Sequence, residues 1–211
     1  GMAYWYKAAP SALDPEKGAS DARGRAPIVL FHGIGLGWFL YRDFVRDLIA
    51  ANERGAESEG RSGGGGGAPL LLIETPSISL TLPWSPCPKP VDAVRSVMAI
   101  LASRGWDDRR VSLWGHSFGT IYCGWMLKYH PGRVRSCTLV DPVNVGVQRA
   151  TLCRSFLYEP RHRSKMQKFK RWFLHSDPRL VATLMRSFFW WENVLWLSDD
   201  ELDGGSTTRL T

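Results

Sequence analysis

The sequence contains no run of 18 apolar residues, which excludes a membrane-spanning helix among its segments. Its first residues, GMAYWYKAAP, hold no seven-residue apolar stretch, so we expect no secretory signal peptide there. The four cysteines form no CxxC pair, and no histidine cluster has metal-ligand spacing, so we predict no metal and no cofactor. We therefore expect buried free thiols and favour an intracellular location, with membrane association left open.

The chain has 211 residues, of which 44% are hydrophobic and 22% charged, enough for one domain with a sizeable core. Its net charge of +7 is concentrated in residues 149–179, where nine Lys or Arg face two acidic residues. Aromatic residues lie among these cations and continue along the chain to Trp196. This mixture suits an anionic membrane surface or an acidic ligand, and it equally suits a helical cap whose aromatic side faces a pocket. We favour the cap, and we expect no nucleic-acid partner because no binding motif is present.

Apolar patterns alternate along the first 145 residues. Strands are predicted at 4–7, 28–31, 70–73, 111–114 and 137–140, and helices at 38–51, 91–104 and 118–129. Residues 52–68 include five consecutive glycines, which predict a flexible insertion. The alternation predicts an α/β protein with a mostly parallel sheet, helices on both faces and functional groups at the carboxyl ends of the strands.

Residues 115–119, Gly-His-Ser-Phe-Gly, match the G-x-S-x-G pattern between a predicted strand and a predicted helix. The tight turn would expose Ser117 as a nucleophile and place the Phe118 N–H at the start of a helix, where it can stabilise an oxyanion. His116 lies beside the serine and is included in the predicted binding site. The alternative is an ordinary Gly/Ser turn.

A second glycine motif, His-Gly-Ile-Gly at 32–35, follows the predicted strand 28–31. In a hydrolase sheet this loop supplies the second oxyanion donor, so we assign Gly33 and Ile34 to the oxyanion site. The alternative is a phosphate-binding turn. A dinucleotide site is disfavoured because the third glycine is missing and Glu74 lies too far along the chain.

In this order, the two motifs resemble the α/β-hydrolase superfamily over residues 25–145. More narrowly, "RSFFWWENVLWL" (186–197) and "LLLIETPSISL" (70–80) resemble fungal α/β-hydrolase-domain proteins. The resemblance implies an α/β-hydrolase fold with a core at 1–145, a helical cap or lid at 146–197 and a polar tail at 198–211. It also implies a small-molecule substrate and, after the serine, an acid followed by a histidine.

The acid and the histidine are harder to find. Asp141 follows the strand after the elbow and is a candidate acid, although an Asp-Pro turn is the alternative. Of the later histidines, we expect His130 to be structural and His162 to lie on the surface, which leaves His175 as the candidate base. None of them has the strand–loop setting of the family's histidine. We therefore expect that the family's acid–histidine portion lies beyond this chain.

These features predict a serine hydrolase acting on an ester-like or other carbonyl substrate, inactive if its base is absent. Epoxide hydrolases and dehalogenases of the same fold are disfavoured because they carry Asp where Ser117 stands. The alternative is a non-catalytic hydrolase-fold protein whose basic aromatic segment binds lipid or a partner.

Overall fold

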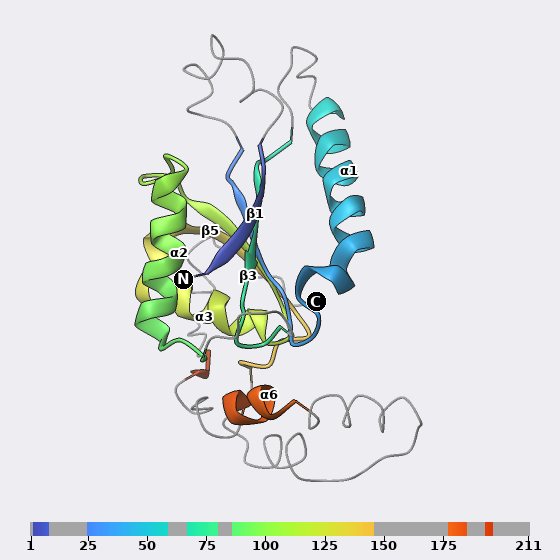
Figure 1. Cartoon of the computed structure of the whole chain (residues 1–211). Coiled ribbons are helices and arrows are strands. Elements are labelled where there is room, and N and C mark those ends of the chain that lie inside the picture. The colour runs from blue at the N-terminus through green and yellow to red at the C-terminus, as the bar shows by residue number, and fades with distance from the viewer. Residues whose placement is uncertain are drawn as a thin grey trace.

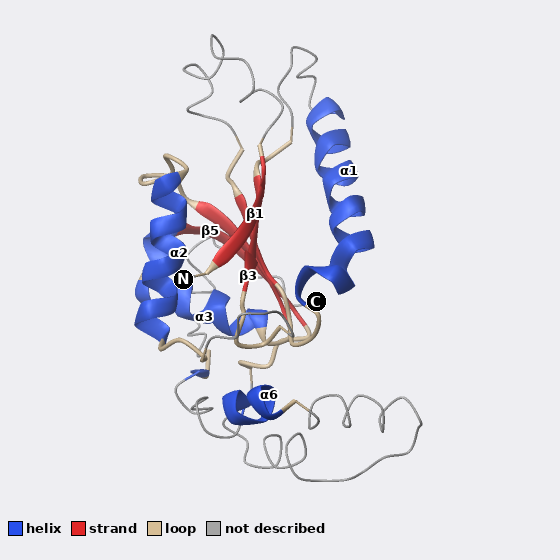
Figure 2. Ribbon diagram, in the orientation of Figure 1, coloured by secondary structure: helices blue, strands red, loops and turns tan. Residues whose placement is uncertain are grey.

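The computed structural model describes residues 2–8, 25–58, 67–79, 86–145, 177–184 and 193–195. Within them, five strands form one sheet in the order β1-β3-β2-β4-β5, with β1 antiparallel to β3 and every other pair parallel. Figure 2 shows this sheet between α1 on one side and α2 and α3 on the other. This is the mostly parallel α/β sheet that the sequence predicts. The strands are β1 (Ala3–Lys7), β2 (Ile28–Phe31), β3 (Leu70–Glu74), β4 (Val111–His116) and β5 (Val134–Val140).

The connecting helices follow the predicted alternation (Figure 1). They are the 3-10 helix η3 (Gly37–Tyr41), α1 (Arg42–Ser58), α2 (Pro90–Ser103), α3 (Gly119–Tyr129), the 3-10 helix η4 (Pro131–Arg133) and α6 (Pro178–Ala182). Four consecutive parallel strands joined by such crossovers bring their carboxyl ends to the same edge of the sheet.

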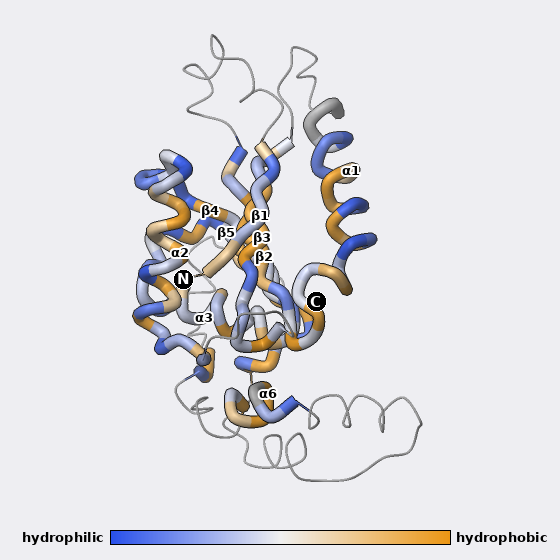
Figure 3. The backbone as a smooth tube through the Cα atoms, in the orientation of Figure 1, coloured by the Kyte–Doolittle hydropathy of each residue, from blue (hydrophilic) through white to orange (hydrophobic). Residues whose placement is uncertain are grey.

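The sheet separates two hydrophobic clusters, because successive strand residues point to opposite faces. The larger cluster lies on the α2 and α3 side and includes Phe31 and Leu113. The smaller one is built on Leu30, Leu70 and Leu72, against which the residues of η3 and α1 pack. All five residues of β3 are buried, as expected for an apolar run covered on both faces. Figure 3 shows hydrophobic and hydrophilic stretches alternating along α1, which covers the sheet with one side only.

The predicted start of the flexible insertion at residue 52 is wrong, because α1 continues to Ser58. The segment after Ala51 holds Glu53 and Arg54, which are good helix formers. Contacts also hold it in place: Asn52 accepts from the N–H of Ala68 and donates to its carbonyl, and Lys7 forms an ion pair with Glu53 at 2.5 Å. Helical propensity and these anchors outweigh the proximity of the glycine run at 63–67. Residues 59–66 lie outside the described part.

After residue 145 the structure describes residues 177–184 and 193–195. Leu180 and Leu184 belong to the larger hydrophobic cluster, and the Thr183 hydroxyl donates to the carbonyl of Ser77 at 3.2 Å. The rest of the predicted cap, the tail at 198–211 and most of the basic segment 149–179 lie outside the described residues. The cap and its membrane-binding role therefore stay predictions. No helix in the described part is long and apolar enough to cross a membrane.

Candidate active site

Ser117 occupies a sharp turn between β4 and α3. Its φ of 51° lies in the left-handed region, where a non-glycine residue is strained. The turn is held by its neighbours: the Ser117 N–H donates to the carbonyl of Val140 at 2.9 Å, and the Thr120 hydroxyl donates to the carbonyl of Ser117 at 2.6 Å. The end of β5 and the first turn of α3 thus fix this strained backbone at the carboxyl edge of the sheet.

The two glycines of the motif are required by close packing. A Cβ at Gly115 would lie 2.7 Å from the Cys123 sulfur and 2.8 Å from the Gly119 carbonyl oxygen. A Cβ at Gly119 would overlap the carbonyl group of Phe31 in the neighbouring strand β2. Because these obstacles include backbone atoms, which cannot rotate away, the turn admits only glycine at both positions.

The loop after β2 lies directly against the serine turn. A Cβ at Gly33 would be 2.9 Å from the Cβ of Ser117. The Gly35 N–H donates to the carbonyl of Ile78 at 3.1 Å, which ties the far end of the loop to the turn after β3. Among the described residues, no acceptor is found for the N–H of Ile34, which is half-buried between them. The structure therefore brings the two glycine motifs together.

Tyr41 links this loop to the serine turn, a role that its sequence position does not reveal. Its hydroxyl accepts from the Gly33 N–H at 2.8 Å and lies 2.7 Å from Nδ1 of His116. The hydroxyl oxygen has one proton and two lone pairs, so it accepts from Gly33 and either donates to Nδ1 of His116 or accepts from it, according to the tautomer of His116. Burial lowers the pKa of His116, and the nearby Asp141 carboxylate opposes that effect. Burial also raises the pKa of Tyr41, beyond what its hydrogen bond to Gly33 offsets.

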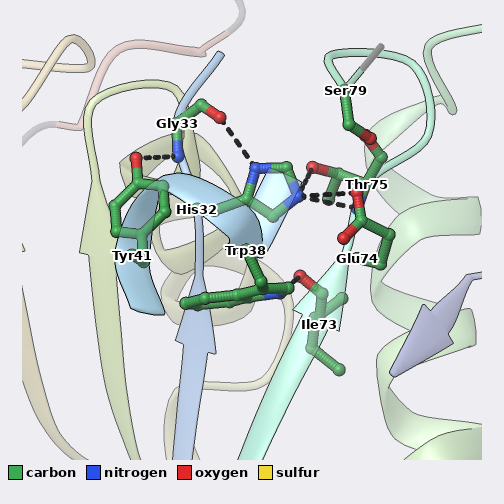
Figure 4. A network of polar contacts seen from close by, with 8 residues as sticks. All are labelled: His32, Gly33, Trp38, Tyr41, Ile73, Glu74, Thr75 and Ser79. Carbon is green, nitrogen blue, oxygen red and sulfur yellow. Dashed lines mark hydrogen bonds and ion pairs between the residues drawn. The ribbon is translucent and has the colours of Figure 1, made fainter. Parts of the chain in front are cut away.

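His32 and Glu74 form a buried polar group beneath the loop, shown in Figure 4. Nε2 of His32 accepts from the Thr75 N–H at 3.1 Å and lies 3.3 Å from Oε1 of Glu74. Burial raises the pKa of Glu74, but its interactions with His32, Ser79 and the Trp38 backbone outweigh burial, and the net direction is down. Burying a carboxylate and an imidazole costs free energy unless they are paired, and here the two groups lie against each other. The only sequence signal was an acidic residue closing an apolar strand.

Asp141, the candidate acid, follows β5 and has a φ of 48°. It is close enough to His116 to influence that pKa, so it lies at the same sheet edge as Ser117. His130 is the C-cap residue of α3, at the end of the helix remote from the serine. His162 and His175 lie outside the described residues. None of the three histidines in the described part forms a hydrogen bond with Ser117, so His175 remains an untested candidate base.

A small, partly open hollow adjoins the site on the α1 side of the sheet. Aromatic rings make up much of its wall, and Tyr41 and His116 provide polar groups there. Its lining residues are Leu30, Phe31, Trp38, Tyr41, Phe44, Trp114, Gly115, His116 and Val140.

No protein-family model and no curated protein matches this chain. Solved structures that resemble it include a probable hydrolytic enzyme from Pseudomonas aeruginosa, with 17% identity over 98% of this chain and 63% of that one, at a TM-score of 0.49. A monoacylglycerol lipase from Paleococcus ferrophilus has 16% identity over 84% and 52% of the two chains, at a TM-score of 0.46. A haloalkane dehalogenase from Agrobacterium tumefaciens has 17% identity over 95% and 56%, also at 0.46. The chain spans less than two thirds of the length of each.

With TM-scores below 0.5, these similarities add no argument about substrate or mechanism. The fold class follows from the structure itself. The strand order, the crossover helices on both faces and the strand–serine–helix turn at the carboxyl edge give the described residues an α/β-hydrolase fold, as the sequence predicts.

Proposed function

We propose that this chain is a serine hydrolase that cleaves an ester-like or other carbonyl substrate through an acyl-Ser117 intermediate. The observation that carries the proposal is the strained Ser117, with Gly33 of the second motif packed against it. A non-glycine residue held at positive φ costs free energy, and such residues concentrate at functional sites. Here the strain occurs at the one residue whose side chain can act as the nucleophile of this motif.

In the proposed reaction, the Ser117 oxygen attacks the substrate carbonyl carbon while a general base takes its proton. The carbonyl oxygen becomes an oxyanion, which the N–H groups of Ile34 and Phe118 stabilise. The carbon–oxygen bond to the leaving group then breaks, and the base returns the proton to the departing alkoxide. A water molecule, activated by the same base, releases the acid product and regenerates the serine.

The proposed reaction needs a general base and an acid that orients it. Asp141 is the candidate acid because it lies at the carboxyl edge of the sheet, close to His116. His175 is the candidate base on sequence grounds alone. A histidine is needed because an unactivated serine is a poor nucleophile, and loss of the histidine from a catalytic triad can lower kcat by a factor on the order of 10⁶.

Hydrolysis of p-nitrophenyl esters of increasing chain length tests the proposal. We expect measurable turnover by the wild-type chain and a fall to the uncatalysed rate in Ser117→Ala. Ser96→Ala, at a partly exposed position of α2, is the matched control and should keep full activity. Turnover that persists unchanged in Ser117→Ala would reject the proposed nucleophile. No turnover with any ester by a folded chain would favour the non-catalytic alternative.

A further inference from the structure

Both polar backbone groups of Gly33 are held by side chains. Its N–H donates to the hydroxyl of Tyr41 at 2.8 Å, and its carbonyl accepts a hydrogen bond from Nδ1 of His32 at 2.7 Å. Figure 4 shows the two side chains on opposite sides of Gly33. Glycine has no Cβ and therefore the widest range of backbone dihedral angles. The two hydrogen bonds restrict the backbone rotation that the loop would otherwise have at Gly33.

The proton on Nδ1 of His32 follows from its hydrogen-bond partner. The Gly33 carbonyl can only accept, so Nδ1 carries the proton. Nε2 faces the Thr75 N–H at 3.1 Å, the Thr75 hydroxyl at 3.0 Å and Oε1 of Glu74 at 3.3 Å. The ring is completely buried and packs edge-on against Trp38. Nδ1 of His32 is therefore a buried donor directed at one carbonyl oxygen.

This bond fixes the direction of the next amide. The Gly33 carbonyl and the Ile34 N–H belong to one planar trans peptide, in which they point in opposite directions. His32 is hydrogen-bonded to Thr75, which follows β3. Ser117 follows β4, which lies on the other side of β2. With its carbonyl turned toward β3, the peptide turns the Ile34 N–H toward the β4 side, where Ser117 lies.

The other amides of the loop are already engaged. The Gly33 N–H is donated to Tyr41 and the Gly35 N–H to the carbonyl of Ile78. Of these three successive amides, only that of Ile34 has no acceptor within the described part of the chain. The loop is arranged so that one amide faces the serine and its neighbours on either side are used to hold it.

We infer that His32 and Tyr41 are positioning residues that aim the Ile34 N–H at the carbonyl oxygen of a substrate bound at Ser117. This inference rests on the proposed function. It adds that hydrogen bonds with His32 and Tyr41 orient the oxyanion donor before the substrate binds. Preorganised donors are effective because they need no rearrangement during the reaction.

Two variants of His32 in the full chain separate positioning from packing. The amide NH₂ of Asn occupies roughly the place of Nδ1, so His32→Asn keeps a donor for Gly33. Gln reaches the place of Nε2, so His32→Gln keeps the contact with Thr75 and loses that donor. We expect kcat to fall by about 100-fold or more in His32→Gln, with KM changed by less than about threefold, and by less than about tenfold in His32→Asn. Equal losses of kcat in both variants, or losses that follow the folded fraction measured by circular dichroism, would overturn the inference.

A readout that does not need turnover accompanies this experiment. Long-range ¹H–¹⁵N spectra of the wild-type chain report which ring nitrogen of His32 carries the proton, and we expect Nδ1–H. A wild-type chain whose serine reacts with a fluorophosphonate but whose His32 carries no proton on Nδ1 would overturn the inference alone. A folded chain whose Ser117 does not react would overturn the proposed function, and the inference with it, whatever the tautomer.

Discussion

The backbone of Gly119 touches that of Phe31: no side-chain atom fits between the first residue of α3 and the last residue of β2. Gly119→Ala must therefore push the helix away from the sheet. We expect it to lower the free energy of unfolding by about 3 kcal/mol or more, at the upper end of overpacking effects. Urea unfolding measures the loss. Gly132→Ala is the control, because a Cβ there would meet nothing within 4 Å, and it should be close to neutral.

Because the backbone at Ser117 is left-handed, we expect glycine to be more stable than alanine there, the reverse of the order in a helix. In an ordinary helix, Gly is less stable than Ala by about 1 kcal/mol, and the Ser96→Gly and Ser96→Ala pair in α2 should show that order. At residue 117, we expect Ser117→Gly to be more stable than Ser117→Ala by about 1 kcal/mol, because glycine relieves the strain. Thermal unfolding of the four variants makes the comparison. The same order at both positions would show that the serine turn is not strained.

The pKa of His116 predicts a pH dependence of stability. Burial lowers this pKa below the value of about 6.5 that an unfolded histidine has, and Asp141 opposes that effect only in part. The unfolded chain therefore binds more protons below about pH 6.5, so the stabilising contribution of neutral His116 is complete above that pH and declines as the pH falls. We expect His116→Gln to flatten the fall in unfolding free energy between pH 7 and pH 5. His130→Gln, at the exposed end of α3, should leave the fall unchanged, and identical profiles for all three proteins would refute the assignment.

Leu180 connects the chain after residue 145 with the core of the sheet. It is almost fully buried in the larger hydrophobic cluster. Leu180→Ala should lower the free energy of unfolding by about 2–4 kcal/mol in the same cooperative transition as the rest of the core. Val91→Ala, half-exposed on α2, should change it by less than about 0.5 kcal/mol. A separate transition for Leu180→Ala would indicate that residues 177–184 belong to an independent cap.

The parts of the site that the sequence predicts are those coded by short local patterns. Gly115, Ser117 and Gly119 fall in one turn, and the reason for both glycines can be argued from chain geometry alone. The strand and helix that flank them also follow from local periodicity. The end of the first long helix does not, because its last turns depend on contacts of Asn52 and Glu53 with segments far along the chain.

The supporting residues could not be predicted in the same way. Tyr41 looks like an ordinary aromatic residue near a helix start, and its role depends on folding against Gly33 and His116. Thr75 meets His32 with its backbone N–H and its hydroxyl, and neither contact can be read from a threonine that follows an apolar strand. Their positions are consequences of which strands become neighbours in the sheet, and this is decided by tertiary packing rather than by local pattern.

The central claim is that Ser117 is an activated nucleophile. The most direct test treats the purified chain with a fluorophosphonate and locates the adduct by mass spectrometry of its peptides. We predict a single adduct at Ser117, absent from Ser117→Ala and retained in Ser96→Ala. A folded chain that gains no adduct, or gains one at another serine, would contradict the assignment of this site as a serine hydrolase centre.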